Sequence, residues 1–159
     1  MSNLSDYPTR LRASTEHPEV IYTRARGYHA VKNAPRAQTK RAVSALEDDD
    51  STYLILHGEP KTLDESVSAV YRGDGGALYV PTGRVFVRLD EGARAEAYAD
   101  AFRKLGFVIA QSLPYAPNAA WLEREDGDAA AALHSIGALE KLPQVRNVEP
   151  QLLTMRSLR

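Results

Sequence analysis

Four carboxylates that could carry out chemistry lie close together near residue 125. They are Glu123, Glu125, Asp126 and Asp128. Two neighbouring carboxylates can act as a general acid and a general base. Asp126 and Asp128 also precede a predicted helix, where a side-chain oxygen would cap the free N–H groups of the first turn. We favour capping over catalysis for these two residues.

Histidine and tryptophan give no stronger sign of a catalytic or metal site. The four histidines, His17, His29, His57 and His134, lack the HExxH spacing and any i, i+4 pair. The GxSxG, GxxxxGK[ST] and GxGxxG patterns are absent as well. Trp121 stands alone in an alternating segment, which favours a core position over stacking on a base or sugar. The sequence therefore predicts a protein that is not an enzyme, with no metal and no cofactor.

Composition is that of an ordinary soluble protein. The 159 residues are 43% hydrophobic and 26% charged, enough for one domain or a small domain with an extension. The net charge of −1 creates no broad positive field, so nucleic acid is not an expected partner. The absence of cysteine excludes disulfides and thiolate metal sites. With no apolar signal segment and no run of roughly 18 apolar residues, we expect no membrane partner and a cytoplasmic location for the chain as given.

The pattern of the N-terminal half predicts a tail followed by strands. Residues 1–18 are polar, contain two prolines and are expected to be disordered. Residues 19–82 form a β-rich extension, and 34–46 within it fits either a weak helix or a loop. Strands are expected at 19–23, 51–57, 66–71 and 77–81. The last two are joined by RGDGG, whose glycines suit a tight hairpin turn.

The C-terminal half alternates strands and helices. Val85, Val87 and Leu89 share one face of a predicted strand, 84–89. The elements that follow are a helix at 93–105, strands at 107–113 and 119–124, a helix at 129–141 and a strand at 145–149. This order predicts an α+β fold, a ferredoxin-like βαββαβ antiparallel sheet with both helices on one face. The opposite face must be solvated, covered by the N-terminal half, or used for binding.

Several short motifs occur here in a recognisable order. They are STYLILHGEPKT, GRVFVRLDEG, a YAPN turn before AAWLE, DAAAALHSIGALEKLP and PQVRNVEPQL. In this order they resemble the propeptides of subtilisin-like serine proteases, the inhibitor I9-like domains of bacterial convertase-like subtilases. The resemblance places a propeptide-like domain at 83–150 and an extended C-terminal tail at 151–159. It implies an intramolecular chaperone and inhibitor that packs its open sheet face on two protease helices and runs its tail through the substrate cleft.

The resemblance also implies roles for individual residues. Glu149 would face the N-termini of protease helices, where a carboxylate is favoured. The tail that would occupy the cleft is Gln151, Leu152, Leu153, Thr154, Met155, Arg156, Ser157, Leu158 and Arg159. We expect this tail to be extended and weakly held without a partner. Arg159 would suit a basic-specific protease, and Leu158 or Met155 an apolar pocket.

The expected partner is therefore a subtilisin-like serine protease, bound in trans, or in cis by an excised propeptide. This chain has no protease motifs of its own, and the N-terminal half could cover the sheet face. A non-inhibitory docking or assembly subunit is the alternative. A ligand-binding or enzymatic role on the same scaffold has the least support.

Overall fold

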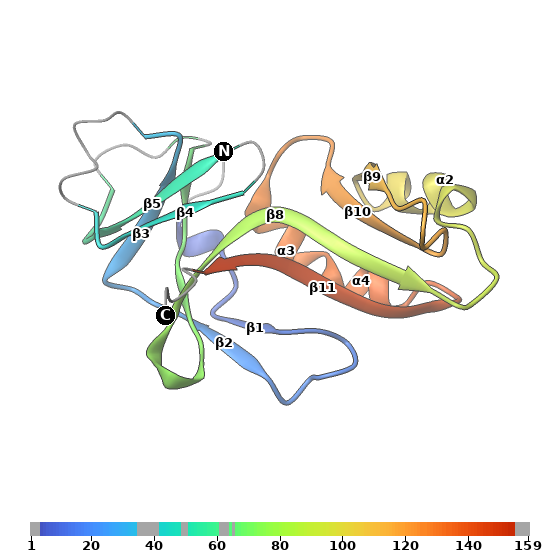
Figure 1. Ribbon diagram of the computed structural model, residues 1–159, viewed down its shortest axis with the longest axis horizontal. Coiled ribbons are helices and arrows are strands. Elements are labelled where there is room, and N and C mark those ends of the chain that lie inside the picture. The colour runs from blue at the N-terminus through green and yellow to red at the C-terminus, as the bar shows by residue number, and fades with distance from the viewer. Residues whose placement is uncertain (1–3, 35–41, 49–50, 61–63, 65, 155–159) are drawn as a thin grey trace.

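The computed structural model describes residues 4–34, 42–48, 51–60, 64 and 66–154. Its strands form two antiparallel sheets (Figure 1). The larger sheet has seven strands: β1 (Arg10–Arg12), β2 (Ile21–Arg24), β7 (Tyr71–Arg72), β8 (Leu78–Leu89), β9 (Phe107–Ser112), β10 (Ala119–Arg124) and β11 (Val145–Thr154). The smaller sheet has four: β3 (Tyr28–Lys32), β4 (Ser44–Glu47), β5 (Thr52–His57) and β6 (Val67–Ser68).

Strand β8 organises the larger sheet. It is 12 residues long, and β11 pairs along one of its sides from Leu89 to Tyr79. On its other side β10 pairs near Val85–Arg88, and β7 pairs with Leu78 and Tyr79. The strand order is therefore β1-β2-β7-β8-β10-β9, with β11 beside β8. The smaller sheet runs β4-β5-β3-β6.

The helical segments are short. They are η1 (Leu4–Asp6), η2 (Asp74–Gly76), η3 (Ala95–Tyr98), α2 (Ala99–Lys104), α3 (Ala129–His134) and α4 (Ile136–Glu140). Asp128 caps α3 by accepting a hydrogen bond from the Ala131 N–H at 3.0 Å, as the sequence predicted. The predicted single helix at 129–141 divides at Ser135, whose hydroxyl donates to the Ala131 carbonyl.

One face of the β9-β10-β8-β11 region is covered by helices. The core there contains Val85, Val87, Leu89, Ala95, Phe102, Phe107, Ala120, Leu122, Ala132, Leu139 and Val148. Helices α3 and α4 lie behind β8 and β11 in the view of Figure 1. The alternation of buried Val85, Val87 and Leu89 leaves their neighbours in β8 on the opposite face.

The predicted ferredoxin-like βαββαβ fold is wrong. Of the described residues, 43% are in strands and 20% in helices, and the strands form a curled antiparallel half-barrel. The predicted strand 77–81 ends at Pro81, but β8 passes through this residue. The register of β11 shifts between Pro150 and Leu152, next to Pro81, and such an irregularity accommodates prolines that cannot donate to the ladder. The added length of β8 brings β1, β2 and β7 into the same sheet, so the boundary expected between 82 and 83 lies inside a strand.

The expectation that residues 1–18 are disordered is also wrong for residues 4–18. Leu4, Tyr7 and Leu11 are buried in a second core cluster together with Tyr71 and Leu133. These residues supply the apolar surface that holds η1 and β1 against the sheet, although the surrounding sequence is polar.

Residues of the smaller sheet contribute to a third core cluster. It contains Ala25, Ala30, Leu46, Tyr53, Ile55, Val70 and Val80. Ser44–Glu47, which begins inside the region 34–46 predicted as helix or loop, is a strand, and 35–41 lies outside the described residues. The RGDGG turn is confirmed, because β7 pairs with β8 across it and Gly75 and Gly76 have positive φ.

Gly106, after α2, is a site where an added methyl group should be costly. Its φ is +90°, and a Cβ there would lie 2.5 Å from Nη1 of Arg124, which donates to the Leu105 carbonyl at 3.2 Å. Gly92 has nearly the same φ, +91°, with nothing within 4 Å of its Cβ. We expect Gly106→Ala to lower the free energy of unfolding by about 1 kcal/mol more than Gly92→Ala in urea denaturation. Equal losses would show that Arg124 moves aside without cost.

Candidate functional site

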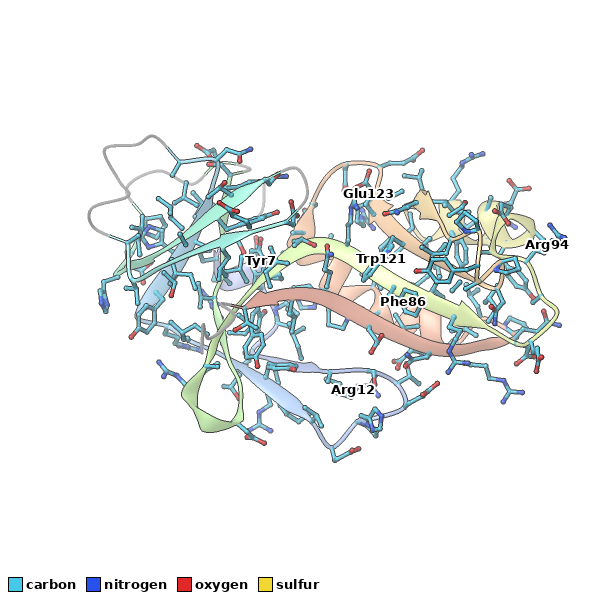
Figure 2. The ribbon with its side chains drawn as sticks, viewed as in Figure 1. Tyr7, Arg12, Phe86, Arg94, Trp121 and Glu123 are labelled. Carbon is cyan, nitrogen blue, oxygen red and sulfur yellow. The ribbon has the colours of Figure 1, made fainter. Side chains whose placement is uncertain are left out.

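The face of the larger sheet opposite the helices carries the candidate site. Antiparallel partners point to the same face, so the register places Glu149, Phe86, Trp121 and Gln111 in one row across β11, β8, β10 and β9. We call this surface, with Arg84, Arg88 and Glu123, the open sheet face. Figure 2 shows Phe86 and Trp121 near the middle of the view, in front of the helices.

An aromatic pair forms the centre of the open sheet face. The rings of Phe86 and Trp121 are 5.2 Å apart between centroids, with an interplanar angle of 63°, an edge-to-face contact. Both side chains are half-buried, although no helix among the described residues packs on this side of the strands. The expectation that Trp121 lies in the core is therefore wrong. The alternation in β10, where Ala120 and Leu122 are the core residues, could have shown it.

Charged residues surround the aromatic pair. Arg84 lies 3.7 Å from the carboxylate of Glu123, and their side chains are 37% and 49% exposed. Arg88 pairs with Glu16 from the β1–β2 loop. An apolar centre with a polar, partly exposed rim is the arrangement of many protein–protein interfaces. The ion pairs at this exposure contribute little to stability, which leaves them free to act in recognition.

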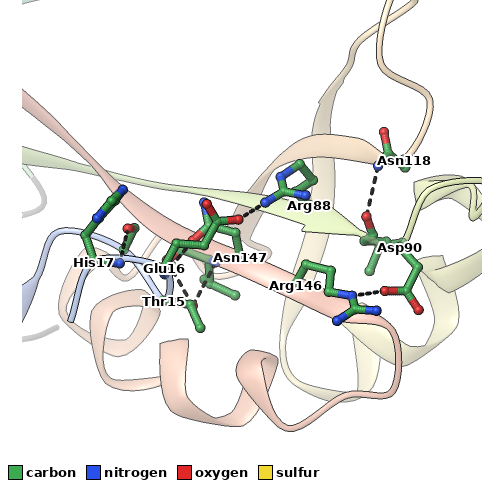
Figure 3. A network of polar contacts seen from close by, with 11 residues as sticks. Thr15, Glu16, His17, Arg88, Asp90, Asn118, Arg146 and Asn147 are labelled. Carbon is green, nitrogen blue, oxygen red and sulfur yellow. Dashed lines mark hydrogen bonds and ion pairs between the residues drawn. The ribbon is translucent and has the colours of Figure 1, made fainter.

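The β1–β2 loop closes part of the edge of β11, as Figure 3 shows. The Thr15 N–H donates to the Val148 carbonyl at 3.2 Å, and the Thr15 hydroxyl oxygen accepts from the Val148 N–H at 3.0 Å. The Glu16 N–H donates to Oδ1 of Asn147 at 3.3 Å. The side chain of Glu16 forms an ion pair with Arg88, so this loop fixes one border of the open sheet face.

Glu149 lies on the open sheet face, next to Phe86 in the neighbouring strand. It is half-buried, and it makes no ion pair within the described part of the chain. A carboxylate in this position is available to donors on a partner. The structure thus brings Glu149 together with Phe86 and Trp121, two residues that the sequence reasoning did not assign to a site.

The first part of the predicted tail is not weakly held. Gln151, Leu152, Leu153 and Thr154 continue β11, so the boundary expected between 150 and 151 lies inside a strand. Leu152 packs against the cluster around Tyr71, and Leu153 packs against the cluster around Val80. The Thr82 hydroxyl donates to Oε1 of Gln151 at 2.6 Å, and the Thr154 hydroxyl donates to the Leu78 carbonyl at 3.0 Å. The other residues predicted to lie in a cleft, Met155, Arg156, Ser157, Leu158 and Arg159, are outside the described residues.

The carboxylates near residue 125 have structural partners. Asp126 accepts a hydrogen bond from Nη2 of Arg124 at 2.7 Å and another from the Asp128 N–H at 3.0 Å. The Arg124 contact, followed by the backbone bond, lowers the pKa of Asp126 to about 2. An acid this strong stays ionised near neutral pH and is a poor general acid. The described residues contain no group of three or more acidic or histidine side chains placed to hold a metal ion.

The low pKa of Asp126 predicts a pH-dependent contribution to stability. A carboxyl whose pKa is lower in the folded state stabilises the fold above its unfolded pKa of about 4, and this contribution is lost as the pH falls towards 2. We expect Asp126→Asn to cost about 0.5 kcal/mol at pH 7, the scale of an exposed ion pair, and progressively less below pH 4. Urea denaturation across this range measures it. Glu125→Gln, which removes an exposed carboxylate without a described ion pair, is the control, and an equal pH dependence in both variants would contradict the assignment.

No protein-family model, curated protein or solved structure matches this chain. Among the described residues, no helix has the length and apolar character that crossing a bilayer requires.

Proposed function

We propose that this chain is a protein-binding module that docks on its partner with the open sheet face. The observation that carries the proposal is the half-buried pair of Phe86 and Trp121 at the centre of a face that no helix covers in the described part of the chain. Aromatic residues are enriched among the side chains that dominate binding energy, because they bury a large area with little loss of conformational entropy. The charged rim would set the orientation of the partner.

The partner that we propose is a subtilisin-like serine protease, which the chain would inhibit or help to fold. Support comes from the position of Glu149 beside the aromatic pair, where a carboxylate could receive the free N–H groups of helix N-termini. The segment proposed to enter the protease cleft must be shorter than the tail predicted from the sequence. Gln151–Thr154 would have to leave β8 and two core clusters to enter a cleft, so the proposal assigns the cleft to Met155–Arg159.

A non-inhibitory docking subunit is the second candidate. The packing of Leu152 and Leu153 into the fold favours it, because these residues already have an intramolecular role. A module of this kind would use the same open sheet face and the same anchors. The two candidates differ in whether the partner is a protease that loses its activity on binding or a protein that the chain does not inhibit.

Binding and inhibition measured separately on a bacterial subtilisin-like protease distinguish these candidates. We expect the full chain to bind and inhibit. A chain ending after Thr154 should still bind, with inhibition at least about tenfold weaker. Glu149→Gln should weaken binding about tenfold, as expected for a lost charge-assisted hydrogen bond, whereas Glu125→Gln should not. Binding without inhibition by the full chain would favour the docking subunit, and no binding would contradict the protease as partner.

A further inference from the structure

A cavity of about 230 Å³ lies between the N-terminal hairpin and the helices, away from the open sheet face. Its walls come from β1, β2, α3, α4 and β11. Five of its lining residues are aliphatic: Leu11, Ile21, Leu133, Ile136 and Val148. An apolar cavity of about 150 Å³ can hold benzene, so this one has room for a somewhat larger molecule.

Gly137 in α4 lines the cavity at an exposed position of the helix. Glycine inside a helix costs about 1 kcal/mol relative to alanine. A Cβ added at Gly137 would meet nothing within 4 Å, and the residue has no positive φ that would require glycine. Neither packing nor backbone geometry therefore explains the glycine. A larger side chain at this position has open space beside the cavity to occupy.

Polar groups at the cavity include a buried donor without an acceptor. Ser14 is only 3% exposed, and its hydroxyl oxygen accepts a hydrogen bond from the His17 N–H at 3.0 Å. In the part of the chain that the structure describes, the hydroxyl proton of Ser14 has no acceptor. A buried donor left in this way is costly unless another molecule accepts from it.

Among the described residues that line the cavity, Arg10 is a cation without an ion pair. Arg12 and Glu140 pair with each other, and Glu140 also accepts from the Thr15 hydroxyl at 2.6 Å. Figure 2 shows Arg12 on the hairpin below β11. Arg10 lies two residues earlier on the same side of β1 and makes no ion pair with any described residue. His134 donates from Nε2 to the Asp6 carbonyl, so that nitrogen is already used.

We propose that this cavity binds a small monocarboxylate with an apolar ring or branched chain. The aliphatic walls take the apolar body, and the Ser14 hydroxyl and the Arg10 guanidinium donate to the carboxylate. Charge-assisted hydrogen bonds of this type are stronger than neutral ones, and the apolar body gains from leaving water. The site is independent of the open sheet face and of any partner bound there.

Titration of the full chain with phenylacetate, followed by backbone amide NMR shifts, tests the site. We expect saturable shifts at Leu133 and Ile136 with a Kd of about 1 mM or lower, given a ligand of about ten non-hydrogen atoms. Toluene and benzylamine, which lack the carboxylate, should bind at least about tenfold more weakly. No saturable shift up to about 10 mM phenylacetate, or equal binding of the three probes, would overturn the proposal.

Variants locate the bound molecule. Gly137→Leu should fill the cavity and abolish binding without lowering the Tm, because the position has open space and leucine is the better helix former. Ser14→Ala should weaken binding about fivefold and Arg10→Gln about tenfold. Arg94→Gln, at an exposed site far from the hairpin in Figure 2, should leave binding unchanged. Unchanged binding in Gly137→Leu, or in both Ser14→Ala and Arg10→Gln, would contradict the site. If Gly137→Leu does not fold, binding to Ser14→Ala and Arg10→Gln decides whether the ligand occupies this cavity.

Discussion

A chain that ends after Pro150 is expected to be less stable than one that ends after Thr154 by at least about 3 kcal/mol. The four residues that differ form the last part of β11. Removing them takes away Leu152 and Leu153, which pack, partly buried, against two different core clusters, and loss of a buried leucine costs about 2–5 kcal/mol. It also removes the pairing of β11 with Pro81, Val80 and Tyr79 in β8.

Urea denaturation of the two truncated chains measures this difference. The double substitution Leu152→Ala and Leu153→Ala in the chain ending after Thr154 separates side-chain packing from strand pairing. We expect it to account for most of the loss, because each side chain is only partly exposed and each contacts a different cluster. Equal stability of the two truncated chains would show that this segment is a free tail after all.

Tyr71→Ala is expected to lower the free energy of unfolding by about 4 kcal/mol. Tyr71 is fully buried in the cluster that receives Leu4, Tyr7 and Leu11. Its hydroxyl donates to the Pro8 carbonyl at 2.6 Å, which joins the N-terminal segment to β7. Aromatic-to-alanine changes in a core leave a large cavity, and here the carbonyl of Pro8 also loses its donor.

Tyr71→Phe is the matched variant. It keeps the ring and removes only the hydrogen bond, so we expect a loss of about 1–2 kcal/mol. In Tyr71→Ala, hydrogen exchange should become faster for β1 and β2 before it does for β10, because the N-terminal strands depend directly on this residue. A loss below about 1 kcal/mol in Tyr71→Ala would mean that the N-terminal segment is not packed on the sheet.

Local signals in the C-terminal half predicted many elements correctly but not how they assemble. The alternation of Val85, Val87 and Leu89 placed the core face of β8, and Asp128 capped its helix. The predicted strand 77–81 ends at Pro81, and proline cannot donate to a ladder. The irregular register opposite it depends on β11, whose residues are far away in sequence, and no local pattern reveals such a pairing.

The N-terminal half was harder to predict for a related reason. Leu4, Tyr7 and Leu11 stand among polar residues, and their burial depends on Tyr71 and Leu133 from distant elements. The adjacent Leu152 and Leu153 fit no one-sided strand, because opposite faces of β11 meet different clusters. At the site, the sequence correctly predicted that one face of the sheet carries no helices among the described residues. Phe86 and Trp121 were missed because a lone aromatic residue in a strand is usually a core residue.

The affinity of the Phe86→Ser, Trp121→Ser double variant for a bacterial subtilisin-like protease tests the central claim most directly. Tyr115→Ser is the control, since Tyr115 is an exposed aromatic residue, 84% accessible, in the connection between β9 and β10. If the open sheet face docks on the protease, the double variant should bind at least about 30-fold more weakly than the unchanged chain, and Tyr115→Ser should bind normally. Equal affinity of the double variant and the unchanged chain, with both shown to be folded, would contradict the claim.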